Sequence, residues 1–362
     1  MKIRPRSSRA TFAVALMLAA SLFVAACGGD EESSDTTAAA GSGSSGDATA
    51  EEVRLGFFPN VTHAPALVGL EQGFFEEQLG DTTLSTSAFN AGPEAVEALF
   101  ADALDITYIG PNPAINAFAQ SDGEAIRIVS GSTSGGAFLV TSPDITSAEQ
   151  LKGKSIATPQ LGNTQDVALR VWLEEEGLSA DTSGGGDVAI VPQANADTLA
   201  AFIEGDIDGA WVPEPWATRL IKEGGGKVLV DEATLWPEGR YVTTHIIVRT
   251  AFLDEFPGTV KAILEGHQAA LDLIESDPEQ AQLDTNAQIE ALTDSPLPED
   301  VLADSWANLT FTDDPIASSL EQSAQDAEQV GLLDPVDLSG IYDLSIINSL
   351  LTEAGEPEVD GL

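Results

Sequence analysis

The chain has 362 residues, of which 59 are acidic and 15 basic, so its formal net charge is −44, and 43% of its residues are hydrophobic. Phosphate backbones repel so acidic a protein, which argues against nucleic-acid binding. The single cysteine, Cys27, excludes a disulfide within the chain and leaves the remaining residues without a cysteine metal site or a thiol nucleophile.

The N-terminus has the features of an export signal. Four basic residues precede an apolar run over residues 11–24, which is shorter than the roughly 20 residues of a membrane span. The run ends in Val-Ala-Ala-Cys-Gly, which is similar to the bacterial lipobox and implies that residues 1–26 are a signal peptide and Cys27 is lipidated. The alternative is an ordinary signal peptide with an incidental cysteine. Cleavage removes four basic residues and no acidic ones, so 11 minus 59 gives a mature charge of −48.

Residues 27–51 are mostly Gly, Ser, Ala, Thr and acidic residues, and they include no large apolar side chain. Such a segment buries too little apolar surface to offset its ordering entropy, so we expect a flexible acidic tether. The remaining sequence contains no apolar stretch long enough to span a membrane. We therefore expect a soluble body anchored outside the cell membrane.

From residue 52 onward, short apolar strand-like runs alternate with amphipathic helical runs, which predicts an α/β fold with largely parallel sheets. Residues 95–113 (AVEALFADALDITYIGPNP) and 198–216 (TLAAFIEGDIDGAWVPEPW) share one apolar pattern at an offset of 103 residues. Each copy predicts a helix, a tight turn, a strand and a proline-bearing loop, with Tyr108 and Trp211 in the core. The alternative is a chance similarity between two βα units.

The position of the second copy predicts two lobes. Short apolar runs at residues 137–140 and 245–248 flank that copy, where strands would carry the chain into a second lobe and back. We predict a discontinuous first lobe over residues 52–138 and 246–362 and an inserted second lobe over residues 139–245. Ligands favour such interdomain clefts and the carboxyl ends of parallel strands.

Four predicted loops lie between a strand end and a helix start, at residues 58–63, 90–93, 110–113 and 161–165. They contain Gly, Asn, Thr and Pro but neither Lys nor Arg. Helix N-termini present unpaired N–H groups and about half a positive charge, so they bind small anions without a basic side chain. The alternative for each single loop is ordinary helix capping.

Other candidates for the cleft are His63, which follows a strand, and His245, near the expected hinge. Glu214 and Trp216 end the second copy, where a cleft wall is expected. For each histidine the alternative is a structural role. The sequence has no GxSxG, HExxH or Walker motif and no metal-ligand cluster. We therefore expect no enzyme activity, no cofactor and no metal.

Four segments together resemble the solute-binding proteins of nitrate, sulfonate and taurine importers, a superfamily that includes receptors for a thiamin pyrimidine precursor. They are RLGFFPNVTHAPALVGLEQGFF, AGPEAVEALFADALDITYIGPNPAINAF, LKGKSIATPQLGNTQDVALRVWLEEEGL and AAFIEGDIDGAWVPEPWATRL, within a resemblance over about residues 53–350. The resemblance implies a two-lobed periplasmic-binding-protein fold of type II, with two crossover strands at the hinge and closure on the ligand. It also implies ligand contacts from ten residues: Phe58, Asn60, His63, Gly92, Pro93, Asn112, Asn163, Thr164, Glu214 and Trp216.

The resulting hypothesis is a monomeric, lipid-anchored receptor on the outer face of the cytoplasmic membrane. It would bind an aliphatic sulfonate, taurine or a similar oxyanion and deliver it to an ABC permease with a cytoplasmic ATPase. The nearest alternative is a heteroaromatic ligand held by Asn60, His63 and Glu214. An exported enzyme on the same fold and a sensor or adhesion lipoprotein are further alternatives.

Overall fold

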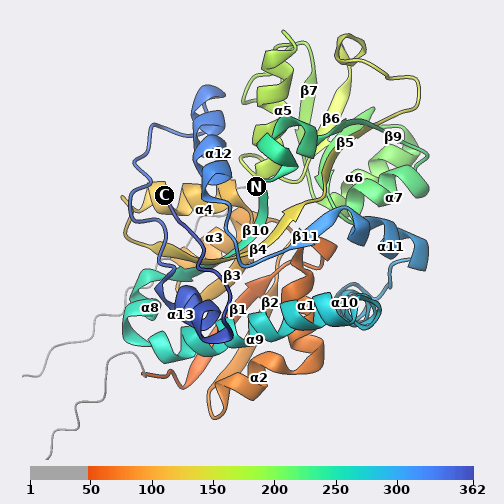
Figure 1. Ribbon diagram of the computed structural model, residues 1–362. Coiled ribbons are helices and arrows are strands. Elements are labelled where there is room, and N and C mark those ends of the chain that lie inside the picture. The colour runs from red at the N-terminus through yellow and green to blue at the C-terminus, as the bar shows by residue number, and fades with distance from the viewer. Residues whose placement is uncertain (1–47) are drawn as a thin grey trace, which may run out of the picture. The chain divides into compact units, whose positions relative to one another are not determined.

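The structure is a computed structural model that describes residues 48–362, in which the strands form two sheets (Figure 1). The first sheet has the strand order β11-β4-β10-β3-β1-β2, and the second has the order β7-β6-β8-β5-β9. The first contains β1 Glu52–Phe57, β2 Thr83–Ala88, β3 Ile106–Ile109, β4 Ile126–Gly135, β10 Val242–Arg249 and β11 Leu309–Phe311. The second contains β5 Ala137–Thr141, β6 Ser155–Thr158, β7 Ala189–Pro192, β8 Gly209–Pro213 and β9 Lys227–Asp231.

The two sheets repeat one topology. In the first sheet β1 pairs in parallel with β2 and β3, and in the second β6 pairs in parallel with β7 and β8. An antiparallel strand then follows in each sheet, β10 beside β3 and β5 beside β8. The predicted α/β class and the internal duplication are thus confirmed. The sheets are mixed rather than largely parallel, because β10 in the first sheet and β5 in the second run antiparallel to both of their neighbours.

The duplicated sequences occupy equivalent places. Helix α3 (Gly92–Phe100) leads into β3, and helix α6 (Asn195–Glu204) leads into β8. Tyr108 on β3 and Trp211 on β8 are fully buried, as the shared pattern predicts. Both side chains alternate with neighbours that point to the opposite face of their sheet, which is the geometry of a buried strand.

The chain changes sheet twice. It leaves β4 and enters β5 at Gly135 and Gly136, whose φ angles of 84° and 73° favour glycine. A side chain at Gly136 would also lie 2.2 Å from Leu309 Cδ2. The chain returns between β9 and β10 through two short 3-10 turns over residues 232–239. The lobe boundaries predicted from the sequence stay a prediction.

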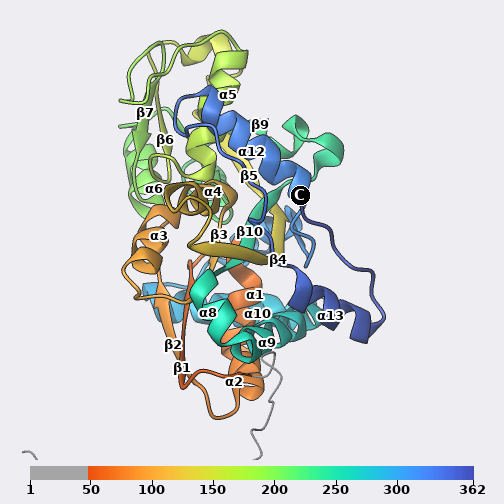
Figure 2. The ribbon, with the colours of Figure 1, turned by 90° about the vertical axis from the view of Figure 1, so that its left-hand side faces the viewer.

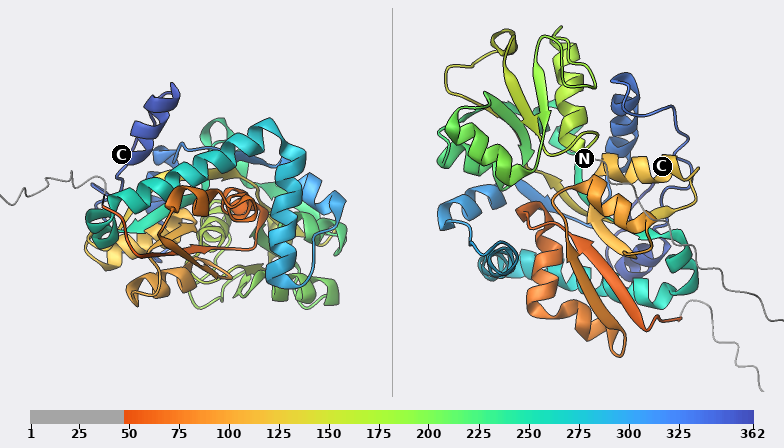
Figure 3. Two further views of the ribbon diagram at one scale, coloured as in Figure 1. Left: turned by 90° about the horizontal axis from the view of Figure 1, so that it is seen from below. Right: turned by 180° about the vertical axis from the view of Figure 1, so that it is seen from behind.

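Helices cover both faces of each sheet (Figures 1–3). On the first sheet, one face packs against α1, α2, α9 and α13, and the other against α3, α4 and α12. On the second sheet, α5 covers one face, and α6 and α7 cover the other. Besides α3 and α6, the helices are α1 Ala64–Gln72, α2 Phe74–Leu79, α4 Pro111–Gln120, α5 Thr164–Glu175, α7 Trp216–Lys222, α8 Thr250–Glu255, α9 Pro257–Ser276, α10 Pro278–Thr293, α11 Glu299–Ala307, α12 Ala317–Gln329 and α13 Ser345–Ala354.

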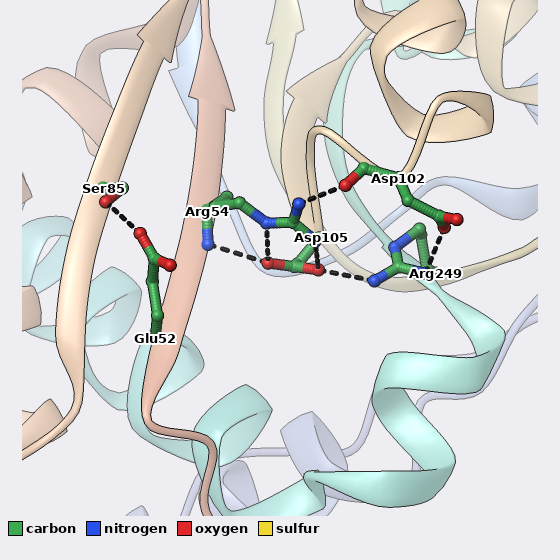
Figure 4. A network of polar contacts seen from close by, with 6 residues as sticks. All are labelled: Glu52, Arg54, Ser85, Asp102, Asp105 and Arg249. Carbon is green, nitrogen blue, oxygen red and sulfur yellow. Dashed lines mark hydrogen bonds and ion pairs between the residues drawn. The ribbon is translucent and has the colours of Figure 1, made fainter.

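An ion network around the buried carboxylate of Asp105 lies at the amino ends of β1 and β3 (Figure 4). Asp105 accepts hydrogen bonds from the backbone N–H and the guanidinium of Arg54, and from Arg249 Nη2 at 2.7 Å. Burial alone would raise the pKa of Asp105, but these hydrogen bonds outweigh it and hold the pKa below its ordinary value. The network therefore stabilises the end of the first sheet that is opposite the carboxyl ends of β1 and β3.

Candidate functional site

A small cavity of about 30 Å³ lies where the carboxyl ends of parallel strands from both sheets meet. Every one of the six strands β1, β2, β3, β6, β7 and β8 contributes its final residue or the segment that follows it. This is where ligands bind in α/β folds. The cavity is lined by Phe58, Asn60, Thr62, His63, Asn90, Ala91, Gly110, Pro159, Asn163, Thr164, Gln165, Asn195, Pro213, Thr243 and Thr244.

Several helices begin at this cavity. The residues that precede α3, α4 and α5 are Ala91, Gly110 and Asn163, and all three line it. None of these three residues caps its helix with a side-chain hydrogen bond. The first N–H groups of a helix have no partner inside the helix and carry a partial positive charge. Pro93, Pro111 and Pro113 have no N–H, so α3 and α4 offer few donors, whereas α5 begins with Thr164 and Gln165 and can donate to an anion, as the sequence predicted for its loop.

Three lining side chains carry a buried polar atom without a hydrogen-bond partner. These atoms are Thr164 Oγ1, Thr244 Oγ1 and Asn195 Oδ1, and the three residues are between 1% and 7% exposed. A buried hydroxyl or amide without a partner costs about 1–3 kcal/mol, so nearly all such groups in proteins are paired. The two hydroxyls can donate to a ligand, whereas Asn195 Oδ1 can only accept a hydrogen bond and would not bond an anion. The two unpaired hydroxyls at one cavity therefore point to a ligand with acceptor atoms.

His63 is a neutral hydrogen-bond donor at the cavity. Its Nδ1 accepts a hydrogen bond from the Phe58 backbone N–H at 3.3 Å, so its proton belongs on Nε2. Burial lowers the pKa of His63 to about 3. The ring also packs on the Phe58 ring, with 4.4 Å between centroids. The imidazole is therefore uncharged at any physiological pH.

The lining contains no Lys, Arg, Asp or Glu. Its polar groups are hydroxyls, amides, one neutral imidazole and backbone. Such a set can bind an anion through hydrogen bonds, yet it offers no carboxylate to pair with the ammonium group of a zwitterion.

Contacts between the two halves close the cavity. We call residues 137–231 the second half and the other described residues the first half. Trp216 Nε1 of the second half donates to Asn60 Oδ1 of the first at 2.8 Å, and Gln160 Nε2 donates to Glu94 Oε1 at 2.8 Å. Gly110 also lies so close to α5 that an added Cβ would be 2.7 Å from Thr164 Oγ1. A ligand larger than the cavity would therefore enter only if the halves part.

Five of the ten residues that the resemblance implied line the cavity: Phe58, Asn60, His63, Asn163 and Thr164. Trp216 reaches it through its hydrogen bond to Asn60. Gly92 and Pro93 begin α3, directly after the lining residue Ala91. Their contact with a ligand stays a prediction.

The structure does not place Asn112 and Glu214 in the lining. Asn112 Nδ2 donates to the Ser323 carbonyl on α12 at 3.1 Å. The fully buried Glu214 carboxylate accepts hydrogen bonds from both halves. Its four donors are Thr218 N, Thr218 Oγ1, Ser305 Oγ and Asn308 Nδ2, at 2.8–3.1 Å. Its acceptor capacity is thus used for structure, and it does not face the cavity as an unpaired charge.

The other two histidines are also buried. Both ring nitrogens of His245, next to the lining residue Thr244, have no partner. His267 Nδ1 lies 3.0 Å from the Tyr108 hydroxyl, which indicates a structural role. Burial lowers the pKa of each imidazole to about 3.

Sequence reasoning named no site role for Asn195, although a signal for it existed. The two copies are related by an offset of 103 residues, so Asn195 corresponds to Gly92. Each of these residues is the first of its helix. The sequence analysis also gave no site role to Thr243 and Thr244. They lie on β10, whose place between β3 and β4 is a tertiary feature.

Within residues 48–362 the structure shows no group of three or more His, Cys, Asp or Glu side chains that could hold a metal ion. Across the same residues, no helix has both the length and the hydropathy needed to cross a bilayer. The predicted signal peptide, Cys27 and nearly all of the predicted tether lie outside the described residues.

Curated relatives of this chain are binding proteins. A putative binding protein of Brucella abortus is 27% identical over 215 residues, which cover 59% of this chain and 64% of the relative. The taurine-binding periplasmic protein of Escherichia coli is 30% identical over 198 residues, which cover 55% of this chain and 59% of the relative. The putative aliphatic sulfonates-binding protein of Bacillus subtilis is 26% identical over 319 residues, 86% of this chain and 92% of the relative. The chain thus spans under two thirds of the first two relatives.

Solved structures confirm the fold. The nitrate-binding protein of Synechocystis PCC 6803 matches with a TM-score of 0.70 at 17% identity, over 85% of this chain and 90% of that one. The alkanesulfonate-binding protein of Xanthomonas axonopodis pv. citri matches with a TM-score of 0.66 at 20% identity, over 80% and 96%. The predicted periplasmic-binding-protein fold is therefore correct. The model of the NMT1-like family matches residues 46–289, and the chain belongs to that family.

Proposed function

We propose that this protein is the solute-binding component of an ABC importer and that it holds a sulfonate or a similar small oxyanion in the cavity between its halves. One observation carries the proposal: Thr164 and Thr244 present buried hydroxyls without partners to a cavity where helices begin and no charged side chain lies. An oxyanion would accept hydrogen bonds from these hydroxyls and from the helix N–H groups. The names of the taurine- and sulfonate-binding relatives support the same ligand class.

The cavity favours a compact ligand without an ammonium group. Its volume of about 30 Å³ corresponds to about two water-sized spheres. Glu214, the buried carboxylate that the sequence named as a site candidate, is bonded to four donors and does not line the cavity. An unpaired ammonium in such a site carries a desolvation cost of several kcal/mol. A short alkanesulfonate should therefore bind more tightly than taurine.

The remaining steps of transport follow from the same proposal. The ligand enters with the halves apart, and the hydrogen bond from Trp216 to Asn60 forms as they close. The closed, liganded protein is then recognised by a membrane permease that a cytoplasmic ATPase drives. Lipidation of Cys27 would hold the monomer on the outer face of the membrane. Replacement of Cys27 by Ser should release the exported protein from the membrane fraction, and retention there would contradict the anchor.

A thermal-shift panel on residues 48–362 tests the ligand class. Ethanesulfonate, taurine, nitrate, bicarbonate and an aminopyrimidine would each be added at rising concentrations. A ligand at 100 times its dissociation constant adds about 2.7 kcal/mol to the free energy of unfolding. We expect ethanesulfonate to stabilise the protein more than taurine does. A response to the aminopyrimidine alone would replace the oxyanion with a heteroaromatic ligand, and no response to any compound would refute the binding function.

A further inference from the structure

The cavity wall formed by α5 is held by a buried ion pair that the proposed function does not use. Asp166 is fully buried in the first turn of α5, and Arg170, one turn later, is 2% exposed. Arg170 Nε lies 3.1 Å from Asp166 Oδ2, and Arg170 Nη2 lies 3.1 Å from Asp166 Oδ1. This two-bond arrangement fixes both side chains in one geometry.

The same carboxylate holds the loop that lines the cavity. Asp166 Oδ2 accepts from the Gly162 N–H at 2.9 Å, and Asp166 Oδ1 accepts from the hydroxyl of Thr158, the last residue of β6, at 2.9 Å. The loop between them turns at Gly162, where φ is +74°. Residues of this loop and of the helix start form one wall of the cavity: Pro159, Asn163, Thr164 and Gln165.

A carboxylate at this position would repel an anion bound in the cavity. Asp166 directly follows the lining residue Gln165, so its charge lies within about one helical turn, roughly 5 Å, of the cavity wall. It opposes the partial positive charge of the helix N-terminus. Arg170 cancels that negative charge. Other elements packed against α5 bring acidic groups, since Asp181 follows on the next loop and Asp326 of α12 lies near Glu175.

We propose that Arg170 is a positioning residue that lets the α5 wall accept an anion, because it neutralises the carboxylate that Asp166 needs to hold the loop. The proposal rests on the oxyanion-binding function. Arg170 does not line the cavity, and its third hydrogen bond, from Nη1 to the Asp181 carbonyl at 2.6 Å, holds the guanidinium toward the loop that follows α5.

Titration calorimetry with ethanesulfonate tests the proposal in four proteins: wild type, Arg170→Met, Arg170→Lys and Asp166→Asn. One unit charge at about 5–10 Å in a protein interior changes affinity by at least about tenfold. We expect Arg170→Met to weaken binding at least about tenfold and Arg170→Lys, which restores the charge without the two-bond geometry, to recover most of the loss. Asp166→Asn removes the repelling charge and should bind at least as tightly as wild type.

If the ion pair between Asp166 and Arg170 only holds the loop in place, we expect a different result. Arg170→Lys would then bind as weakly as Arg170→Met, and Asp166→Asn would bind more weakly than wild type because the loop loosens. Either result overturns the proposal. If Arg170→Met does not fold by circular dichroism, the Asp166→Asn and Arg170→Lys results decide alone. Absence of any oxyanion binding by the wild type refutes the proposed function and this inference with it, whereas wild-type binding without the predicted order of variants refutes only this inference.

Discussion

Replacement of Thr164 by Val should change stability and affinity in opposite directions. The two side chains have nearly the same shape, so the substitution removes the hydroxyl and little else. Thr164 Oγ1 is buried without a hydrogen-bond partner, and the residue is 7% exposed. Its removal relieves a desolvation cost of about 1–3 kcal/mol, so the free energy of unfolding of the unliganded protein should rise by about 1 kcal/mol.

The same hydroxyl should matter for the ligand. A hydrogen bond to a charged acceptor contributes about 1.5–3 kcal/mol, which corresponds to a Kd for ethanesulfonate that is about 10- to 100-fold higher in Thr164→Val. Guanidinium unfolding without ligand and titration calorimetry with ethanesulfonate measure the two effects.

A matched control is available on α8. Thr250 Oγ1 is also buried without a partner, but Thr250 does not line the cavity. Thr250→Val should therefore change stability in the same direction while leaving the Kd for ethanesulfonate unchanged. An unchanged Kd in Thr164→Val, or a loss of stability without ligand, would refute the role assigned to this hydroxyl.

Four further predictions follow from charges and pKa values. First, affinity for ethanesulfonate should be constant from pH 5.5 to 8.5, because His63, with a pKa of about 3, stays neutral and no other titratable side chain lines the cavity. A change in affinity with a midpoint near pH 6.5, measured by calorimetry, would contradict this. Second, affinity should rise with ionic strength, because added salt screens the repulsion from a mature charge of −48; weaker binding in salt would indicate a locally basic site. Third, burial raises the pKa of Glu232 from 4.5 to about 7. Between these two pH values the folded state holds a proton that the unfolded state has lost, so the free energy of unfolding falls as the pH rises. The stability of Glu232→Gln relative to wild type should thus increase by about 2 kcal/mol from pH 5 to pH 8 in urea unfolding, and parallel pH profiles would exclude the raised pKa. Fourth, Asp105→Asn should lower the free energy of unfolding by about 2 kcal/mol, because it leaves two partly exposed arginines without their buried partner. The Kd for ethanesulfonate should stay unchanged, and any change in it would show that this network affects the cavity.

Local sequence chemistry was sufficient to predict the fold class and much of the cavity. Strand ends followed by Pro, Gly, Asn or Thr predicted helix starts at residues 58–63, 90–93, 110–113 and 161–165, and each segment contributes to the lining. These positions depend on backbone capping and turn preferences, which are local. The repeated apolar pattern likewise predicted two equivalent βα units, since burial of one face depends on periodicity alone.

Side-chain direction could not be predicted in the same way. Glu214 follows β8 as a cleft residue would, yet its carboxylate turns to donors on α7 and near α11. Asn112 lies in the first turn of α4, but its side chain bonds to a carbonyl of α12. Thr218 is only four residues from Glu214, but Ser305 lies 91 residues from Glu214 and Ser323 lies 211 residues from Asn112, so only tertiary packing brings the distant partners together.

The central claim is that neutral donors from both halves hold a small oxyanion, and a crystal structure of residues 48–362 grown with ethanesulfonate tests it most directly. We predict sulfonate oxygens within hydrogen-bond distance of Thr164 Oγ1, Thr244 Oγ1 and the first N–H groups of α5, with the hydrogen bond between Trp216 and Asn60 intact. A sulfonate bound elsewhere, or one paired with a Lys or Arg side chain, would contradict the account.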